Sequence, residues 1–115
     1  MAAGVLDIVV EQGSTFSRTI TLRDGSNNPI NLTGATVRGQ LRPEYTSDIV
    51  VPFVLSITAP ATSGTIAWSL SAADSARLSS SPDVSWVYDI EVEYAGGVVE
   101  RVLQGQATIS PEVTR

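Results

Sequence analysis

Apolar side chains recur at every second residue along most of this chain, which is the period of a half-buried β-strand. In the segment 84–94, bulky apolar residues face one way while polar and acidic residues face the other. The same alternation between turn residues predicts about eight strands. We expect them at residues 5–11, 15–23, 35–42, 49–58, 65–70, 84–94, 98–104 and 106–110.

Turn-forming residues separate these segments. Asp24-Gly25, followed by Asn27-Asn28-Pro29, predicts a turn because Gly and Asn tolerate positive φ and Pro fixes its own. The paired glycines at 96–97 predict a hairpin. Pro52 inside the apolar run 49–58 indicates an edge strand or a bulge, and Gly105 indicates a bulge or bend between the last two strands.

One segment departs from the period of two. Ser71 is expected to cap a short helix near 72–78, with the carboxylate of Asp74 reaching back to the cap amide. The Ser-rich stretch 79–82 is expected to end this helix.

We find no internal repeat and no linker, and 115 residues are too few for two cores. The sequence therefore predicts a single all-β domain over residues 1–115, an antiparallel β-sandwich of immunoglobulin-like character.

The amino-acid composition excludes several kinds of catalysis and metal binding. The chain contains no Cys, His or Lys, so His- and Cys-based catalysis, Schiff-base chemistry and His- or Cys-ligated metals have no residues to use. We expect no enzyme activity, no catalytic residues, no cofactor and no metal. The net charge of -5 opposes nucleic-acid binding.

Targeting features are not evident in the sequence. No apolar run approaches the roughly 18 residues that span a bilayer, and residues 1–4 carry no basic segment ahead of an apolar one, as a secretory signal would. We therefore expect no membrane partner and synthesis in a cytoplasm.

A row of carboxylates is the strongest candidate site. Asp89, Glu91 and Glu93 share one face of a predicted strand and could bind a hard cation such as calcium. Alternate strand residues stand about 6.5 Å apart, so their carboxylates repel rather than converge. The sequence favours a solvated charged face instead. Its expected arginine partners are Arg101 and Arg38 or Arg42.

Other candidates receive structural interpretations. Asn31-Leu32-Thr33 matches the N-glycosylation pattern, but we interpret it as a turn. Tyr45 lies in a polar loop and is the aromatic residue expected to be exposed. Arg18 lies on the apolar face of its strand, where it is expected to snorkel or to pair with a carboxylate, an anion contact being the alternative. The other candidate aromatics are expected to pack inward: Trp68, Trp86, Tyr88 and Tyr94.

Several segments carry a resemblance in their order along the chain. They are EQGSTFSR at 11–18, DG at 24–25, PINLTG at 29–34, YDIE at 88–91, LQG at 103–105 and PEVTR at 111–115. Together they resemble small β-sandwich structural proteins of tailed bacteriophages, similar to the immunoglobulin-like modules of baseplate upper proteins and tail-fibre attachment proteins.

Glycines and apolar residues in these segments have structural interpretations. Phe16, Leu32 and Tyr88 fit core positions. Four glycines fit positions that need positive φ or a close approach of backbone: Gly13, Gly25, Gly34 and Gly105.

The resemblance implies a non-enzymatic structural component of a phage virion, made in the bacterial host cytoplasm. Its implied partners are other virion proteins of the tail, baseplate, fibre or capsid, including further copies of the chain in a homo-oligomer. We expect strand addition at exposed sheet edges, assembly arms at 1–7 and 111–115, and interface contacts from Arg18, Tyr45 and Arg115. Two alternatives remain open: a capsid decoration protein and a host-glycan-binding module that uses Tyr45.

Overall fold

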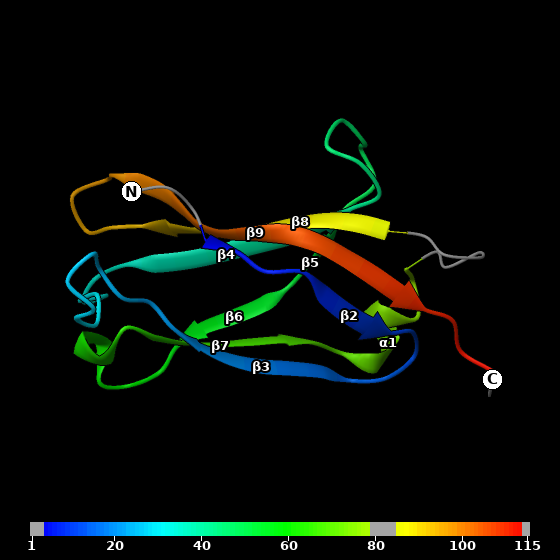
Figure 1. Cartoon of the computed structure of the whole chain (residues 1–115), viewed down its shortest axis with the longest axis horizontal. Coiled ribbons are helices and arrows are strands. Elements are labelled where there is room, and N and C mark those ends of the chain that lie inside the picture. The colour runs from blue at the N-terminus through cyan, green and yellow to red at the C-terminus, as the bar shows by residue number, and fades with distance from the viewer. Residues whose placement is uncertain (1–3, 79–84, 114–115) are drawn as a thin grey trace.

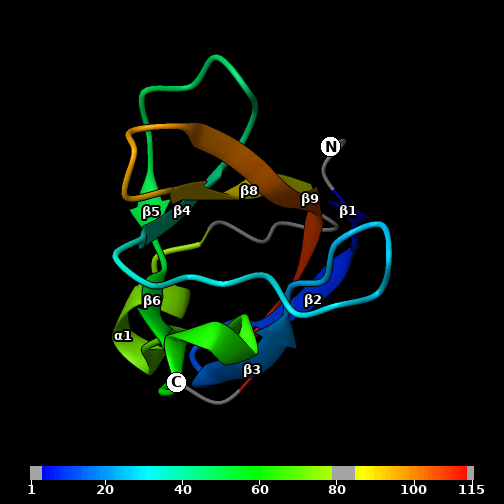
Figure 2. The same cartoon turned by 90° about the vertical axis from the view of Figure 1, so that its left-hand side faces the viewer.

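Two β-sheets face each other across an apolar interior in the computed structural model, which describes residues 4–78 and 85–113 (Figures 1 and 2). The predicted all-β sandwich is confirmed. Nine strands run through the described residues: β1 (Gly4–Val5), β2 (Ile8–Glu11), β3 (Phe16–Thr21), β4 (Thr36–Arg42), β5 (Val51–Pro52), β6 (Val54–Ile57), β7 (Thr65–Leu70), β8 (Ser85–Glu93) and β9 (Val99–Ser110). A 3-10 helix, η1 (Ala61–Ser63), and one α-helix, α1 (Ala72–Ser75), complete the elements.

The larger sheet has six strands and the smaller has three. The strand order of the larger sheet is β1-β9-β8-β4-β5, with β2 also beside β9. The strand order of the smaller sheet is β3-β7-β6. The ladders are antiparallel except where β1 and β2 pair in parallel with β9. The predicted strand 5–11 is thus two short strands along one edge, separated by Leu6 and Asp7.

The run 49–58 also divides, because the chain changes sheets there. β5 pairs with β4 in the larger sheet, whereas β6 pairs with β7 in the smaller one. Pro52 ends β5, and the next residue, Phe53, is buried and donates its backbone N–H to the Gly39 carbonyl at 3.0 Å. Both halves are edge strands, so the prediction from Pro52 is confirmed.

The predicted bulge at Gly105 is wrong, because residues 99–110 form one continuous strand. The irregularity lies earlier: Ile90 pairs with Leu103 and Glu91 with Arg101, which leaves Val102 as the extra residue. Gly105 pairs regularly with Tyr88. Its lack of a side chain has another cause, since a Cβ there would overlap the Leu6 carbonyl. The alternative expectation for this glycine, a close approach of backbone, is confirmed.

The helix is shorter than the predicted 72–78, and its cap is partly as expected. Ser71 Oγ accepts the Asp74 backbone N–H at 3.1 Å, so Ser71 is the N-cap. The Asp74 carboxylate pairs with Arg77 at 3.2 Å, instead of reaching back to the cap amide as predicted. The predicted stop at 79–82 lies outside the described residues.

Left-handed backbone occurs at two of the four predicted glycines, Gly13 (φ 83°) and Gly34 (φ 75°). The expectation for Gly25 is wrong, since it has neither a positive φ nor a close neighbour. Asn27 takes the left-handed position of that turn, with φ 65°. Asp24 organises the turn instead, because its carboxylate accepts the backbone N–H groups of Ser26 and Asn28.

An aromatic cluster joins the two sheets. The Trp68 ring of the smaller sheet lies 5.3 Å from the Tyr88 ring of the larger sheet, measured between centroids. Phe53, at the crossing between sheets, packs edge-on against both rings at 5.2 and 6.0 Å. Phe16 completes the cluster at 5.3 Å from Trp68. The predicted inward positions of Trp68, Trp86 and Tyr88 are confirmed, and Leu32 is also fully buried.

Leu6 and Asp7 form the link between β1 and β2, and this link lies directly over Gly105. Tyr88 donates its hydroxyl to the Leu6 carbonyl, and Leu6 donates its N–H to the Gln104 carbonyl at 2.9 Å. Asp7 accepts the Gln106 backbone N–H at 3.0 Å. A core tyrosine thereby adds a side-chain hydrogen bond to the backbone pairing that holds the N-terminal edge of the sheet.

Replacing Gly105 should destabilise the sandwich. In Gly105→Ala the added methyl group meets the Leu6 carbonyl and separates this link from β9, so we expect a loss of about 2 kcal/mol or more in the free energy of unfolding. Urea denaturation measures it. Gly96→Ala is the matched control, because a Cβ there has no neighbour within 4 Å. Equal losses in both variants would contradict the close-approach explanation.

Removing the Tyr88 hydroxyl should change how stability depends on pH. Burial, with a smaller contribution from the Asp7 charge, raises the pKa of Tyr88 to about 12 from an ordinary value of 10.0. Between these values the unfolded chain loses the phenolic proton and the folded chain keeps it, so the Tyr88 contribution to stability is lost as pH rises.

The variant Tyr88→Phe lacks this contribution. We expect it to lose about 1 kcal/mol at neutral pH, through the missing hydrogen bond to Leu6, and to show a shallower decline above pH 10. Urea denaturation at a series of pH values measures both effects. Parallel curves for the variant and the original chain would argue against a buried, proton-holding Tyr88.

Candidate functional site

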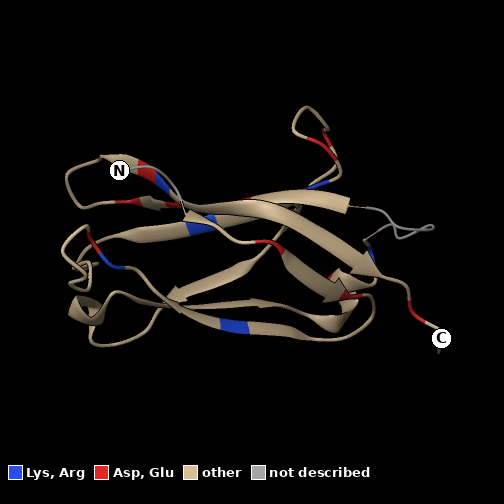
Figure 3. Cartoon of the chain, viewed as in Figure 1, with Lys and Arg blue, Asp and Glu red and all other residues tan. Residues whose placement is uncertain are grey.

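Charged residues of both signs occur along the strands of the larger sheet (Figure 3), and their side chains form ion pairs on its outer face. Arg38 on β4 contacts Glu91 at 2.9 Å and Glu93 at 3.6 Å, and Arg101 on β9 contacts Asp89 at 3.4 Å. The predicted solvated face with arginine partners is confirmed. Within the described ranges 4–78 and 85–113, the acidic residues do not gather into a group that could hold a metal ion.

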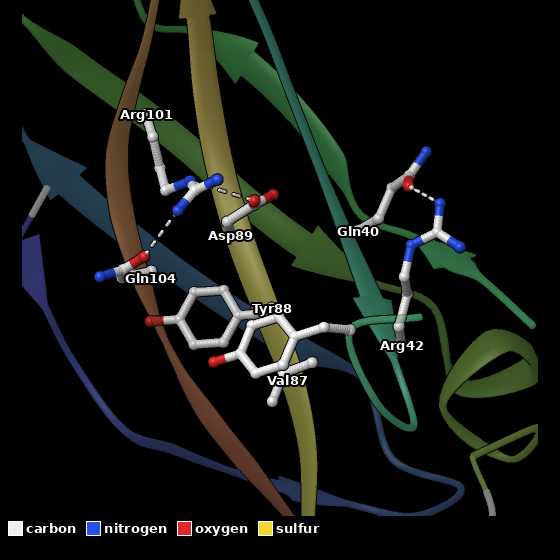
Figure 4. Close-up of a pocket in the computed structure, with 8 residues that line it drawn as sticks. Gln40, Arg42, Val87, Tyr88, Asp89, Arg101 and Gln104 are labelled. Atoms are coloured by element: carbon white, nitrogen blue, oxygen red, sulfur yellow. Dashed lines mark hydrogen bonds and ion pairs between the residues drawn. The ribbon is translucent and has the colours of Figure 1, made fainter. Parts of the chain in front are cut away.

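A hollow of about 220 Å³ lies on this face beside the loop 43–50, which rises away from the sheet in Figure 1. Tyr45 borders the hollow from the loop and is 84% exposed. Val87 provides an apolar part of its lining. Neighbouring strands contribute the polar part, drawn in Figure 4: Gln40 and Arg42 from β4, Asp89 from β8, and Arg101 and Gln104 from β9.

Hydrogen bonds and an ion pair hold most of these polar groups in place. Arg101 donates to Gln104 at 3.1 Å while its Nε faces Asp89. Arg42 donates to the Gln40 side-chain oxygen at 3.1 Å and to the Ser47 carbonyl, which ties the loop to the strand below it. The hollow therefore has prepositioned donors rather than freely rotating side chains.

Asp89, the acid of this hollow, is partly buried. Burial raises the pKa of Asp89 above its ordinary value, and the neighbouring Glu91 charge acts in the same direction, while Arg101, Arg42 and Arg38 oppose the shift. Because burial is the largest cause, the Asp89 carboxylate is partly shielded from water. Asp89 is still an ordinary ion-pair partner, 3.4 Å from Arg101.

The second candidate surface is the open side of the sandwich, where β2 and β3 are edge strands of different sheets. A groove of about 360 Å³ lies there, lined by Val9, Glu11 and residues 14–18. Val9 is 55% exposed. This side thus combines an accessible apolar side chain, one acid and the basic Arg18.

Arg18 is exposed on β3, with its guanidinium carbon 4.8 Å from the centre of the Phe16 ring. It also donates to the Ser17 carbonyl at 3.3 Å. The predicted snorkelling is confirmed, because the chain of Arg18 runs along an aromatic ring to reach solvent. Among residues 4–78 and 85–113, no carboxylate lies within ion-pair distance of it.

Alternate backbone groups of β3 point away from the sheet. Leu22, just past the strand, donates its N–H to the Gly64 carbonyl beside β7. In an antiparallel ladder the direction alternates, so Ile20 and Arg18 face β7 in the same way. The N–H and carbonyl groups of Ser17 and Thr19 consequently face the free edge.

The structure separates the predicted interface residues. Arg18 lies on the smaller sheet, whereas Tyr45 lies above the outer face of the larger one. Arg115 lies outside the described residues. In the predicted arms, Gly4–Val5 pairs with β9, and Glu112 donates its backbone N–H to Gln12 at 3.2 Å.

Two further interpretations from sequence concern possible glycan chemistry. Asn31 accepts hydrogen bonds from the backbone N–H and the hydroxyl of Thr33, at 3.0 and 2.6 Å, so the segment is a turn as predicted. Tyr94 is half-buried and donates to Glu100 at 3.1 Å. Tyr45 is exposed as expected, and it borders the hollow.

Sequence reasoning did not group the residues of the hollow. It named Arg42, Asp89 and Arg101 only as ion-pair partners. The signal that could have joined them is the strand register, since Gln40 pairs with Asp89, and Asp89 with Gln104, across adjacent strands.

Comparison with known proteins gives no family. No family model and no curated protein matches the chain. Among solved structures, murine CRIg is similar at 7% identity and a TM-score of 0.43, covering 92% of each chain. An internalin-like protein of Listeria monocytogenes is similar at 17% identity and a TM-score of 0.38, over 96% of this chain and 28% of that one. Likenesses this distant say nothing about activity.

In the described part of the chain, no helix has the length and apolar character needed to cross a membrane.

Proposed function

We propose that this chain is a non-enzymatic structural subunit that assembles by strand addition at β3, in the tail, baseplate or fibre-attachment region of a tailed bacteriophage. The observation that carries the assembly role is the free edge of β3. This edge strand has six residues, and its outward N–H and carbonyl groups can pair with another chain.

The edge of β3 has little of the protection that commonly blocks strand pairing. Proline, short length and charged side chains discourage edge-to-edge contacts. β3 has no proline, and its charged residue, Arg18, leans over Phe16. The other edge strands in the described ranges have two or four residues each, and β5 ends in Pro52. β3 is therefore the longest edge strand available to a partner.

A second copy of the chain can pair with β3 in one favoured register. If two antiparallel copies are related by a two-fold axis at Thr19, the outward groups of Thr19 pair with their own counterparts. Arg18 then lies opposite Ile20 of the other copy. A two-fold axis at Arg18 would instead oppose two guanidinium groups, so charge repulsion selects the Thr19 register.

The assignment to a virion rests on the resemblance of the ordered segments between residues 11 and 115 to phage β-sandwich modules. Assembly from repeated copies through sheet edges is consistent with it. Other virion proteins are the proposed partners, and the particle is the proposed location.

Placing a charge at the centre of this edge should weaken self-association. We expect the original chain to self-associate in sedimentation velocity runs at increasing concentration. Thr19→Lys, which opposes two ammonium groups at the two-fold axis, should weaken association about tenfold or more. Thr36→Lys is the matched control, because Thr36 is also an exposed strand threonine but lies on β4 of the larger sheet, away from the β3 edge. A chain that stays monomeric, or equal association of Thr19→Lys and the original, would refute pairing through β3.

Copy number in purified particles should test the virion assignment. Quantitative mass spectrometry of particles from the source phage is expected to find the chain in tens of copies or fewer, as for tail and baseplate subunits. Hundreds of copies would identify a capsid decoration protein instead. Absence from particles would refute the virion role while leaving self-association through β3 to be judged on its own.

A further inference from the structure

We propose that the hollow beside Tyr45 binds a carboxylate-bearing sugar, such as a uronic acid residue of a glycan. Tyr45, Val87 and the polar groups of β4, β8 and β9 form the site. This proposal is independent of the assembly role of β3, because the hollow lies on the outer face of the other sheet.

The lining has the mixed character that a sugar ring requires. A pyranose has apolar C–H faces, which stack on aromatic rings, and a rim of hydroxyl groups, which need planar donors and acceptors. Tyr45 offers an accessible ring at the mouth, and Val87 an apolar contact inside. The amides of Gln40 and Gln104 supply both donors and acceptors at the rim (Figure 4).

The size of the hollow limits what can enter. Its volume of about 220 Å³ lies below the roughly 300–1,000 Å³ of pockets that enclose drug-sized ligands. One sugar ring is the appropriate scale, with the rest of a glycan extending into solvent. The surface is open on the Tyr45 side, since that residue is 84% exposed.

Charge balance selects an acidic sugar over a neutral one. Two guanidinium groups line the hollow, and its carboxylate, Asp89, is the partner of Arg101. Arg42 makes its hydrogen bonds to neutral oxygens of Gln40 and Ser47. The hollow thus has one positive charge in excess, in a chain whose net charge is -5. A ligand carboxylate beside Arg42 would neutralise that charge through a charge-assisted hydrogen bond.

Partial burial strengthens this selection. The Asp89 carboxylate is shielded enough for its pKa to rise, which indicates that water screens charges less here than at the open surface. An ion pair between Arg42 and a sugar carboxylate therefore gains more than a pair at a fully exposed position. The hydrogen bond to Ser47 also holds Arg42 and the Tyr45 loop in one arrangement before binding.

Nuclear magnetic resonance titration of the full chain with methyl β-D-glucuronide tests the proposal. We expect shifts in the side-chain amides of Gln40 and Gln104 and in Tyr45, with a dissociation constant on the order of 1 mM. Methyl β-D-glucoside, which lacks the carboxylate, should bind about tenfold more weakly. Acetate at the same ionic strength should produce no shift at Tyr45, because it offers no ring to stack.

Paired variants separate ligand contact from folding. Tyr45→Ala should abolish saturable binding, and Ile49→Ala, an exposed residue of the same loop, should leave it unchanged. Arg42→Gln should weaken binding about tenfold. Arg38→Gln is its control, because Arg38 lies on the same face and strand but pairs with Glu91 and Glu93. Thr19→Lys should bind the sugar normally, which distinguishes this site from the assembly edge.

Three outcomes would overturn the proposal. Absence of shifts at Gln40, Gln104 and Tyr45 would exclude a sugar site in the hollow. Equal binding of glucuronide and glucoside would refute selection by Arg42. Equal shifts with acetate would reduce the hollow to a site for small anions.

Discussion

Contact between aromatic rings of opposing sheets is the interaction on which this fold depends. Trp68 and Tyr88 lie 5.3 Å apart between ring centres, and Phe53 packs against both where the chain passes from one sheet to the other. Large rings bury much apolar surface and make edge-on contacts that fix their relative orientation. Tyr88 extends this order beyond the core, because its hydroxyl holds Leu6 and thereby the parallel N-terminal strands.

The alternating pattern was sufficient to predict most strands, because burial of one face determines register. It gave β7 its observed limits and located the inward residues of β8. It could not reveal that 5–11 breaks at Leu6 or that β1 and β2 run parallel to β9, because those features depend on a distant partner. The role of Gly105 was ambiguous for the same reason, since the backbone that approaches it comes from Leu6, 99 positions earlier in the chain.

Surface chemistry was harder to predict than the fold. The exposure of Tyr45 could be predicted because it lies in a polar loop. The solvated row of Asp89, Glu91 and Glu93 could be predicted because alternate residues of a strand share one face. The hollow could not be predicted from the sequence. It depends on the register of β4, β8 and β9 and on the position of the loop 43–50 beside them. Arg18 was a candidate because it is a charged residue at a position on the apolar face of its strand. The neighbouring open edges of β2 and β3 are visible only in the structure.

The parallel pairing of β2 with β9 has a mechanical consequence. The described chain begins toward one end of the long axis and ends toward the other, so tension applied to its two ends pulls these strands past each other (Figure 1). Their hydrogen bonds, which lie across the direction of pull, are then loaded together in shear instead of being opened one after another. The whole β2–β9 ladder would therefore resist such a pull at once.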